Sequence, residues 1–266
     1  MEDRKINDKT LVNKQYKDDA GLLIRKKLHK NYSTNKQGFA NWLFEIMALP
    51  TQGKILELGS GNGDFWKNNI DELSKDTHLT LSDFSSGMVG TIKSKFDNSK
   101  VDIKRIDIED IPYENDTFDL VIANAMLYHV PQLNKALNEV ERVLKPGGKF
   151  YASTFGENGL SDFISESLKT IGIKTEKKSN YTFTLQNGFD RLDKHFDQVK
   201  RLDYIDQLII KDPLDLVDYI FSMTSMYGLT REDRQAVDKY FNDMTHDKGV
   251  IEIAKEYGSF ISTKKL

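Results

Sequence analysis

The chain has 266 residues, no cysteine, and 38 Lys and Arg against 41 Asp and Glu, which gives a formal net charge of −3. The lack of cysteine excludes a disulfide scaffold, a thiolate metal site and a cysteine nucleophile. The charge balance provides no general attraction to nucleic acid or to an anionic membrane. Residues 1–19 contain no apolar segment of the kind found in secretory signals, and the most apolar stretch, 120–130, is far shorter than the ~18–20 residues of a membrane span. We therefore expect a soluble, cytoplasmic protein.

Residues 1–49 are expected to form an N-terminal helical arm or lid. Residues 1–20 are polar and predict a frayed arm. Apolar residues recur at helical spacing in 20–28 and, more strongly, in 39–49, which predicts two helices. Turn-forming residues at 31–35 separate them, and Pro50 with Gly53 ends the second helix.

Residues 50–156 alternate between strand and helix patterns and form the expected core domain. The predicted strands are 54–58, 77–81, 101–106, 118–124 and 149–155, and the helices between them include 85–96, 134–144 and one that reaches about residue 73. The fourth strand is almost entirely apolar, as expected where helices cover both faces of a sheet. The pattern predicts an α/β fold with a doubly wound, mostly parallel sheet.

Residues 157–266 depart from this alternation and predict a helical cap followed by strands that complete the sheet. A bent strand is expected at 199–210, and a helix begins with Asp212 as N-cap and Pro213 in its first turn. A further helix is expected at 230–244. Residues 250–263 predict a closing hairpin that turns at Tyr257 and Gly258.

A glycine-rich segment follows the first strand of the core, with Gly59, Gly61 and Gly63 at alternate positions. Glycines at a strand-to-helix turn allow positive φ and the close approach of a ligand to the backbone. The third glycine of a dinucleotide fingerprint falls on Asp64, whose carboxylate would repel a pyrophosphate, so the pattern argues against NAD. No Gly-Lys-Ser/Thr follows, which excludes a phosphate-binding P-loop.

Three acidic residues surround this loop. Asp83 ends the second strand, where a carboxylate can accept hydrogen bonds from both ribose hydroxyls. Asp107 follows the third strand and either accepts from an adenine amine or caps a turn. Glu57 begins the loop, where it faces an ammonium group or the N–H groups of the loop. A ligand with a positive centre and no phosphate fits these groups, and S-adenosylmethionine fits them better than a nucleotide.

Five segments in chain order resemble the motifs of class I S-adenosylmethionine-dependent methyltransferases. Residues 57–63 match the signature E/D-x-G-x-G-x-G, and Asp83 matches the acidic end of strand two. The other three are residues 105–109 at the adenine loop, 118–124 at strand four and 142–148 at the turn into strand five. The resemblance covers about residues 50–155 and is strongest to the small-molecule branch (methyltransferase type 11), which includes the ubiquinone/menaquinone methyltransferases.

The resemblance implies a seven-stranded sheet with one antiparallel edge strand from the C-terminal hairpin. It also implies S-adenosyl-L-methionine as cofactor and S-adenosyl-L-homocysteine as product. The cofactor-binding residues that it implies are Glu57, Gly59, Ser60, Gly61, Asp83, Phe84, Asp107, Ile108 and Asn124. Tyr32, ahead of the second N-terminal helix, is a further candidate for contact with the cofactor, with core packing as its alternative.

His129 lies just past strand four, near the expected acceptor, and an unperturbed histidine can act as a general base at neutral pH. The alternative is a histidine packed beneath a lid. Four residues of the cap could form an apolar acceptor pocket or simply pack in its core: Phe183, Tyr219, Met223 and Tyr227. The other histidines show no ligand pattern, so no metal is expected.

We predict an enzyme that transfers a methyl group to an O, N or C atom of a small molecule by in-line displacement. Three alternatives remain open: an NAD-type oxidoreductase, a non-catalytic S-adenosylmethionine-binding protein and an RNA methyltransferase. The first requires the glycine spacing that Asp64 breaks. The last lacks support, because residues 124–127 do not match the N/D-P-P-Y/F motif and the chain has no basic stripe, so nucleic acid is not expected as a partner. The sequence gives no indication of the oligomeric state.

Overall fold

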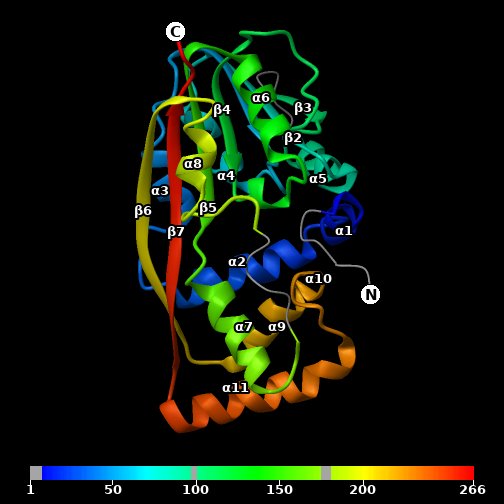
Figure 1. Cartoon of the computed structure of the whole chain (residues 1–266). Helices are drawn as coiled ribbons and strands as arrows, with labels where there is room; N and C mark the ends of the chain where they lie inside the picture. The colour runs from blue at the N-terminus through cyan, green and yellow to red at the C-terminus, as the bar shows by residue number, and fades with distance from the viewer. Residues whose placement is uncertain (1–7, 97–100, 175–180) are drawn as a thin grey trace.

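The computed structural model describes residues 8–96, 101–174 and 181–266. Within these residues one seven-stranded sheet has the order β3-β2-β1-β4-β5-β7-β6 (Figure 1). Strands β1 to β5 are parallel to one another, and β7 is antiparallel to both β5 and β6. The strands are β1 (Gln52–Leu58), β2 (Asp76–Asp83), β3 (Val101–Arg105), β4 (Phe118–Asn124), β5 (Leu144–Phe155), β6 (Asp197–Ile210) and β7 (Ile251–Thr263).

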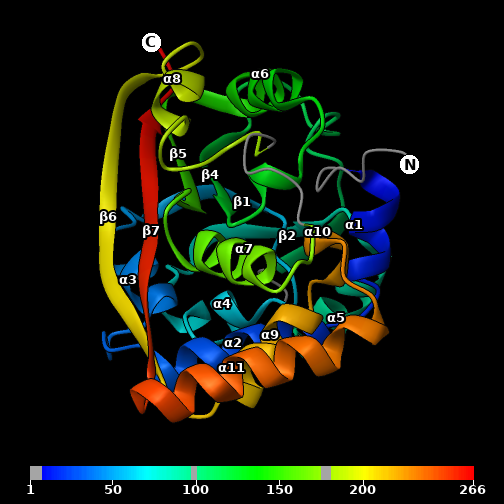
Figure 2. The same cartoon turned by 60° about the horizontal axis from the view of Figure 1, so that its bottom comes forward.

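Helices cover both faces of the sheet and form a separate layer at one end of it (Figures 1 and 2). The α-helices are α1 (Lys9–Gln15), α2 (Ala20–Tyr32), α3 (Phe39–Glu45), α4 (Asp64–Lys67), α5 (Ser86–Lys95), α6 (Leu133–Val143), α7 (Leu160–Thr170), α8 (Gly188–Leu192), α9 (Pro213–Phe221), α10 (Thr224–Tyr227) and α11 (Arg234–Lys248). The short 3-10 helices are η1 (Ile70–Glu72), η2 (Leu127–His129) and η4 (Arg231–Asp233). The predicted doubly wound α/β fold is confirmed.

The apolar strands at the centre of the sheet contribute to two cores, because successive side chains of a strand point to opposite faces. Ile55 of β1 packs with Leu43 of α3 on one face, whereas Leu56 packs with Leu137 of α6 on the other. Helix α6 places its apolar residues at helical spacing along one side, and these are buried. Burial on both faces explains why β4 is apolar along nearly its whole length.

Strand β7 differs from the expectation in two ways. Residues 251–263 form one continuous strand, so the predicted hairpin turn at Tyr257 and Gly258 is wrong. Gly258 instead allows close strand pairing, since a Cβ there would lie 2.5 Å from the carbonyl oxygen of Leu202 on β6. The antiparallel strand also lies between β5 and β6 rather than at the edge of the sheet, and β6 forms that edge.

Helices α2, α7, α9 and α11 form a cap that lies beyond the carboxyl ends of the parallel strands (Figures 1 and 2). The pairing of β5 with β7 ends at Phe155 and Tyr257, and residues 251–256 pair with β6 alone. This two-stranded extension leads to a third core formed by α2, α7, α9 and α11. Asp212 caps α9 as expected, because its side chain accepts a hydrogen bond from the Leu214 N–H. Helix α2 therefore shares a core with the segment after residue 156.

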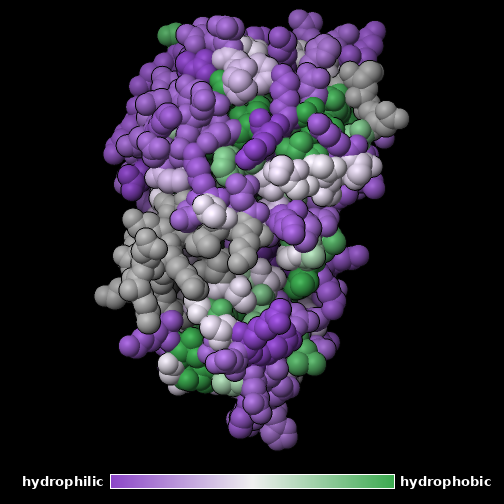
Figure 3. All heavy atoms as spheres, turned by 90° about the vertical axis from the view of Figure 1, so that its right-hand side faces the viewer, coloured by the Kyte–Doolittle hydropathy of each residue, from purple (hydrophilic) through white to green (hydrophobic). Residues whose placement is uncertain are grey.

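The N-terminal arm is more ordered than its polar sequence predicts. Residues 9–15 form α1, and the Ser85 hydroxyl at the N-terminus of α5 donates to the carbonyl of Tyr16 at 2.7 Å. Residues 1–7 lie outside the described residues. In the part of the chain that the structure describes, no helix combines the length and apolarity needed to cross a membrane. On the face shown in Figure 3, polar residues form most of the surface and apolar residues show as separate small patches.

Candidate functional site

The loop between β1 and α4 turns on glycines in the left-handed region. Gly59 has φ +71° and Gly61 has φ +56°, conformations that L residues rarely adopt. A Cβ on Gly59 would lie 2.8 Å from the Cγ atom of Met126, so only a residue without a side chain fits at this position. The loop therefore presents backbone rather than side chains to the space above the sheet.

Asp83, the last residue of β2, holds this loop from the neighbouring strand. Its Oδ2 accepts from the Gly61 N–H at 2.9 Å and its Oδ1 accepts from the Ser85 N–H at 2.8 Å. Burial raises the pKa of Asp83 to about 6, although these backbone donors act in the opposite direction. Each carboxylate oxygen keeps a lone pair for a further donor.

Glu57, the residue before the end of β1, lies beside Asn124, the last residue of β4. The Asn124 amide donates to Glu57 Oε1 at 3.2 Å, and its own oxygen accepts from the Ser153 hydroxyl at 3.1 Å. Burial raises the pKa of Glu57 to about 7. Glu57 Oε2 is buried and has no hydrogen-bond partner among the described residues. A buried carboxylate with an unsatisfied oxygen is costly unless a ligand donates to it.

Residue Ala125, which follows Asn124, has φ +50°, a strained conformation for a residue other than glycine. Its N–H donates both to the carbonyl and to the hydroxyl of Ser153. Strain of this kind is concentrated at functional sites. The backbone therefore turns sharply at the end of β4, where the side chains of η2 begin.

The segment after β3 forms the opposite wall. Asp107 accepts from the Glu109 N–H through Oδ1 at 3.0 Å and from the Lys9 ammonium through Oδ2 at 2.6 Å. Asp107 thus stabilises a turn, which is one of the two expectations, and it also lines the cavity. Phe84 and the buried Ile108 line the same wall.

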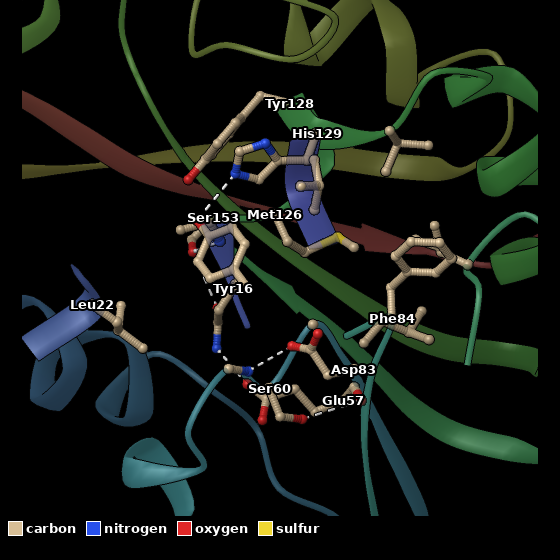
Figure 4. Close-up of a pocket in the computed structure, with 18 of the residues that line it drawn as sticks. Tyr16, Leu22, Glu57, Ser60, Asp83, Phe84, Met126, Tyr128, His129 and Ser153 are labelled. Carbon is tan, nitrogen blue, oxygen red and sulfur yellow. Dashed lines mark hydrogen bonds between the residues drawn. The ribbon is translucent and has the colours of Figure 1, made fainter. Parts of the chain in front are cut away.

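These groups surround one cavity of about 320 Å3 at the carboxyl ends of the parallel strands, a size typical of small-molecule sites. Figure 4 shows Glu57, Ser60 and Asp83 on one side and Tyr16 with His129 on the other. The cavity brings together ten residues singled out from the sequence: Glu57, Gly59, Ser60, Gly61, Asp83, Phe84, Asp107, Ile108, Asn124 and His129.

Tyr32 does not line the cavity, so the proposed contact between Tyr32 and the cofactor is not supported. Helix α2 continues to residue 32 rather than ending near residue 28, and this turns Tyr32 toward α9. Its hydroxyl donates to Asp215 Oδ2 at 2.8 Å, and its ring packs against the core of the cap. The alternative of core packing describes its position.

A second cavity of about 1170 Å3 adjoins the first and lies between the sheet and the cap. Tyr16, Arg25, Ala125, Tyr128 and His129 line both cavities, so the two spaces meet at these residues. Three of the four cap residues considered for an acceptor pocket line the second cavity: Tyr219, Met223 and Tyr227. The fourth, Phe183, is buried in the core beside β5 and β7.

His129 lies at the junction of the two cavities. Its Nε2 is 3.1 Å from the hydroxyl oxygen of Tyr16, and the two rings meet edge to face with centroids 5.6 Å apart. Burial raises the pKa of Tyr16, whereas the positive charge of Arg25 acts in the opposite direction. Tyr16 therefore stays protonated at neutral pH, and the tautomer of the His129 ring decides which of the two groups donates in this hydrogen bond.

Several residues of the N-terminal segment line the first cavity and were not singled out from the sequence, among them Lys9, Tyr16 and Arg25. Lys9 binds Asp107 and Glu109, at 2.6 Å and 2.7 Å. No local motif marks these residues, because their role depends on how α1 and α2 fold back over the sheet. Among the described residues, no cluster of three or more His, Asp or Glu side chains is placed to hold a metal ion.

Residues 56–152 match the family model of the methyltransferase domain. The C-methyltransferase UbiE of ubiquinone/menaquinone biosynthesis from Bartonella quintana is 31% identical over 106 residues, which are 38% of this chain and 41% of that protein. A malonyl-[acyl-carrier protein] O-methyltransferase from Acetivibrio thermocellus is 30% identical over 133 residues, 49% of this chain and 46% of that protein. The chain thus matches less than half the length of these curated relatives.

The fold also has counterparts among solved structures. Phosphoethanolamine N-methyltransferase 2 from Haemonchus contortus, in complex with phosphomonomethylethanolamine and S-adenosylhomocysteine, superposes with a TM-score of 0.58 at 15% identity. The superposition covers 93% of this chain and 58% of that one. The sheet order, the glycine loop and the sequence matches agree, and residues 56–152 therefore form a methyltransferase domain of the class I S-adenosylmethionine-dependent family.

Proposed function

We propose that this protein is an S-adenosylmethionine-dependent methyltransferase that transfers a methyl group to an O, N or C atom of a small-molecule acceptor. The observation that carries the proposal is the arrangement of the two cavities. The first contains the residues that the resemblance assigns to the cofactor, and it opens at His129 into a second, larger space beneath the cap. A methyltransferase needs such a pair of adjoining sites, because the acceptor atom must align with the methyl group.

The residues of the first cavity fit the cofactor. Its ammonium group would supply the donor that Glu57 Oε2 lacks, and its ribose hydroxyls would donate to Asp83. Asp107, Ile108 and Phe84 would surround the adenine ring. When bound, S-adenosylmethionine supplies a methyl group activated by the positive charge of its sulfonium.

The chain itself then has three tasks: to orient the acceptor, to exclude water and to remove a proton where the acceptor requires it. The tyrosines and the cap helices around the second cavity enclose the acceptor. His129 would accept the proton of a hydroxyl acceptor, and Tyr16, which contacts Nε2, would fix the orientation of its ring. An amine acceptor would only need to arrive neutral.

The electrostatics of the loop argue against the oxidoreductase alternative. Asp64 begins α4, where a dinucleotide would place its pyrophosphate, and it accepts from Lys26 and Lys95 at 2.8 Å and 2.7 Å. Burial acts to raise the pKa of Asp64, but the two lysines outweigh it and lower the pKa to about 2. The carboxylate is therefore ionised at neutral pH and would compete with a phosphate group for both lysines.

Calorimetric titration with S-adenosylhomocysteine tests the cofactor, with NADH as the control ligand. We expect micromolar binding of S-adenosylhomocysteine by the wild type, at least about tenfold weaker binding by Asp83→Ala, and no binding of NADH. Asp119→Ala is the matched control, because Asp119 also pairs with a backbone N–H, that of Lys54, but does not line the cavity. Absence of binding by the wild type would refute the proposal, and tight NADH binding would favour the oxidoreductase.

A transfer assay separates an enzyme from a protein that only binds the cofactor. The protein is incubated with S-adenosylmethionine carrying a 13C-labelled methyl group and with a protein-free metabolite extract. We expect label in a small molecule together with equimolar S-adenosylhomocysteine, and neither product with Asp83→Ala. Label found only when RNA is supplied would instead identify an RNA methyltransferase.

A further inference from the structure

We propose that the second cavity binds an anionic acceptor, a carboxylate or a phosphate monoester attached to an apolar, ring-containing body, and that Arg25 binds its charge. The inference rests on the proposed methyltransferase function and specifies its substrate class. The starting observation is the guanidinium group of Arg25, whose N–H donors find only part of their hydrogen-bond acceptors in the protein.

Arg25 lies on α2, where it faces both cavities. Its Nη1 donates to the Ser222 carbonyl over a long 3.4 Å, and its Nη2 is buried with no hydrogen-bond partner in residues 8–96, 101–174 and 181–266. Its guanidinium stacks on the Tyr16 ring, 5.3 Å from the ring centroid. A planar guanidinium that is partly removed from water is well suited to bind a carboxylate or phosphate.

Two other arginines of the chain have the carboxylate partner that Arg25 lacks among the described residues. Arg142 pairs with Glu139 at 2.8 Å, and Arg234 pairs with Asp218. In the described part of the chain, Arg25 donates to the Ser222 carbonyl and to no carboxylate. A guanidinium nitrogen that is buried without a hydrogen-bond acceptor is unfavourable, so the structure favours a negatively charged ligand at this point.

The charges around the second cavity favour the same sign. The carboxylates that line it, Asp64 and Glu256, are both engaged: Asp64 pairs with two lysines, and Glu256 accepts from the Asn158 N–H and the Gln186 amide, each at 2.8 Å. An ammonium acceptor would thus find no uncommitted carboxylate among the described lining residues. An anion would instead meet the guanidinium group of Arg25.

Aromatic side chains form much of the remaining lining. They include Tyr128, Phe155, Tyr219, Tyr227 and Tyr257. The lining also includes His29, whose Nε2 lies 3.2 Å from the Tyr257 hydroxyl and whose Nδ1 has no partner within the described residues. Rings of this kind pack against a flat apolar body, and the free imidazole nitrogen can contact one polar substituent.

Arg25 faces a rival role, since the methionine carboxylate of the cofactor is also an anion. The contacts of α2 separate the two roles. Lys26 is the cation of α2 next to the glycine loop, where it binds Asn62 Oδ1 at 2.9 Å and Asp64. Arg25 is instead anchored to Ser222 at the end of α9, in the cap. This arrangement assigns Arg25 to the acceptor side.

The test measures the binding of four ring probes to the protein saturated with S-adenosylhomocysteine: benzoate, phenyl phosphate, benzamide and benzylamine. They share a ring and differ in charge. We expect at least one of the two anions to bind at least about tenfold more tightly than benzamide and benzylamine, as a charge-assisted hydrogen bond predicts. Benzoate and phenyl phosphate distinguish a carboxylate from a phosphate acceptor.

In the variant Arg25→Gln, the affinity for the preferred anion relative to benzamide should fall about tenfold. The affinity for S-adenosylhomocysteine should stay within about threefold of the wild type. Arg234→Gln is the matched control, because Arg234 also stacks on a ring, that of Phe221, but lies on the outer helix α11. Should Arg25→Gln fail to fold, the preference of the wild type and of Arg25→Lys still decides the question.

Three results would overturn the inference. They are equal or tighter binding of benzylamine, unchanged binding of the anions by Arg25→Gln, or a tenfold loss of S-adenosylhomocysteine affinity in that variant while the anions bind as before. The last result would assign Arg25 to the cofactor. Failure of the wild type to bind S-adenosylhomocysteine would refute the proposed function itself, before any probe is added.

Discussion

Glu57 and Asp83 are buried carboxylates that remain partly protonated near neutral pH, and this couples ligand binding to pH. Burial raises the pKa of Glu57 to about 7 and that of Asp83 to about 6. A ligand that brings an ammonium group to Glu57 and hydroxyl donors to Asp83 favours the ionised forms. We predict that the affinity for S-adenosylhomocysteine rises at least about tenfold from pH 5 to pH 7.5, and that binding near pH 6.5 releases protons.

Calorimetry in buffers of different ionisation enthalpy measures the proton release directly. In Glu57→Gln the release should fall and the pH dependence should weaken, because one titrating group is gone. The ligand-free protein provides a second check. Its native state binds more protons than its unfolded state between about pH 4.5 and 7, so its unfolding free energy should fall as the pH rises through this range. An affinity that is flat between pH 5 and 7.5 would contradict the prediction.

Gly59 has a positive φ and also lies too close to Met126 for any side chain to fit. The backbone cost and the steric cost of a substitution there can be measured separately. In Gly59→Ala the new methyl group would meet the side chain of Met126, so the loop must shift. Gly249 has φ +77° with no heavy atom within 4 Å, so Gly249→Ala measures the backbone cost alone, about 1 kcal/mol. We predict that Gly59→Ala costs more in unfolding free energy and weakens S-adenosylhomocysteine binding at least about tenfold, whereas Gly249→Ala leaves binding unchanged. Equal binding by both variants would contradict this.

Helix α1 is held over the first cavity by few contacts, and Lys9 provides two of them. Its ammonium bridges Asp107 and Glu109, of which Glu109 is almost fully buried. We predict that Lys9→Gln increases hydrogen exchange in residues 8–16 by roughly fivefold, because a partly exposed ion pair contributes up to about 1 kcal/mol. Mass spectrometry of peptides from this segment measures the change. Lys27→Gln, which removes an exposed ion pair with Asp215, should leave the exchange of α1 unaltered.

The parallel core was predictable because its elements are encoded locally. Strand β4 is apolar along nearly its whole length, the motif at Gly59 lies where a strand turns into a helix, and Asp212 caps α9, which begins at Pro213. In contrast, the strand β7 was misinterpreted as a hairpin because a Tyr-Gly pair resembles a turn. Gly258 is required by the carbonyl of Leu202, which lies 56 positions earlier in the chain but is adjacent in the sheet. No local pattern contains that contact.

The same distinction applies to the candidate site. Residues that follow strands, such as Asp83 and Asn124, were identifiable because parallel strands bring their carboxyl ends to one edge. Tyr16 and Arg25 were not identified, since a polar arm carries no signal for the surface it covers. Tyr32 was proposed as a cofactor contact from the resemblance and from its position ahead of the second N-terminal helix, but it ends α2 and its hydroxyl donates to Asp215 instead.

The cap and the sheet share one structural element, the extension of β6 and β7, and a buried ion pair lies within it. Lys255 pairs with Asp206, and both side chains are almost completely buried, at 2% and 0% exposure. Lys255 also donates to the Ser33 hydroxyl at the end of α2. This pair thus connects the cap helix to the strands that carry the cap.

Removing one partner of this pair leaves a buried charge without compensation, which typically costs about 3–5 kcal/mol. We therefore predict that Asp206→Asn lowers the melting temperature strongly, and that the protein still unfolds in one transition because the cap and the sheet share β6 and β7. Replacing both residues, as in Asp206→Leu with Lys255→Met, should restore much of the stability, since no charge is left unpaired. Asp243→Asn, which removes an exposed pair with Lys239, is the control and should change little. Calorimetric unfolding that separates into two transitions would show that the cap and the sheet are independent units, and would contradict this view of the molecule.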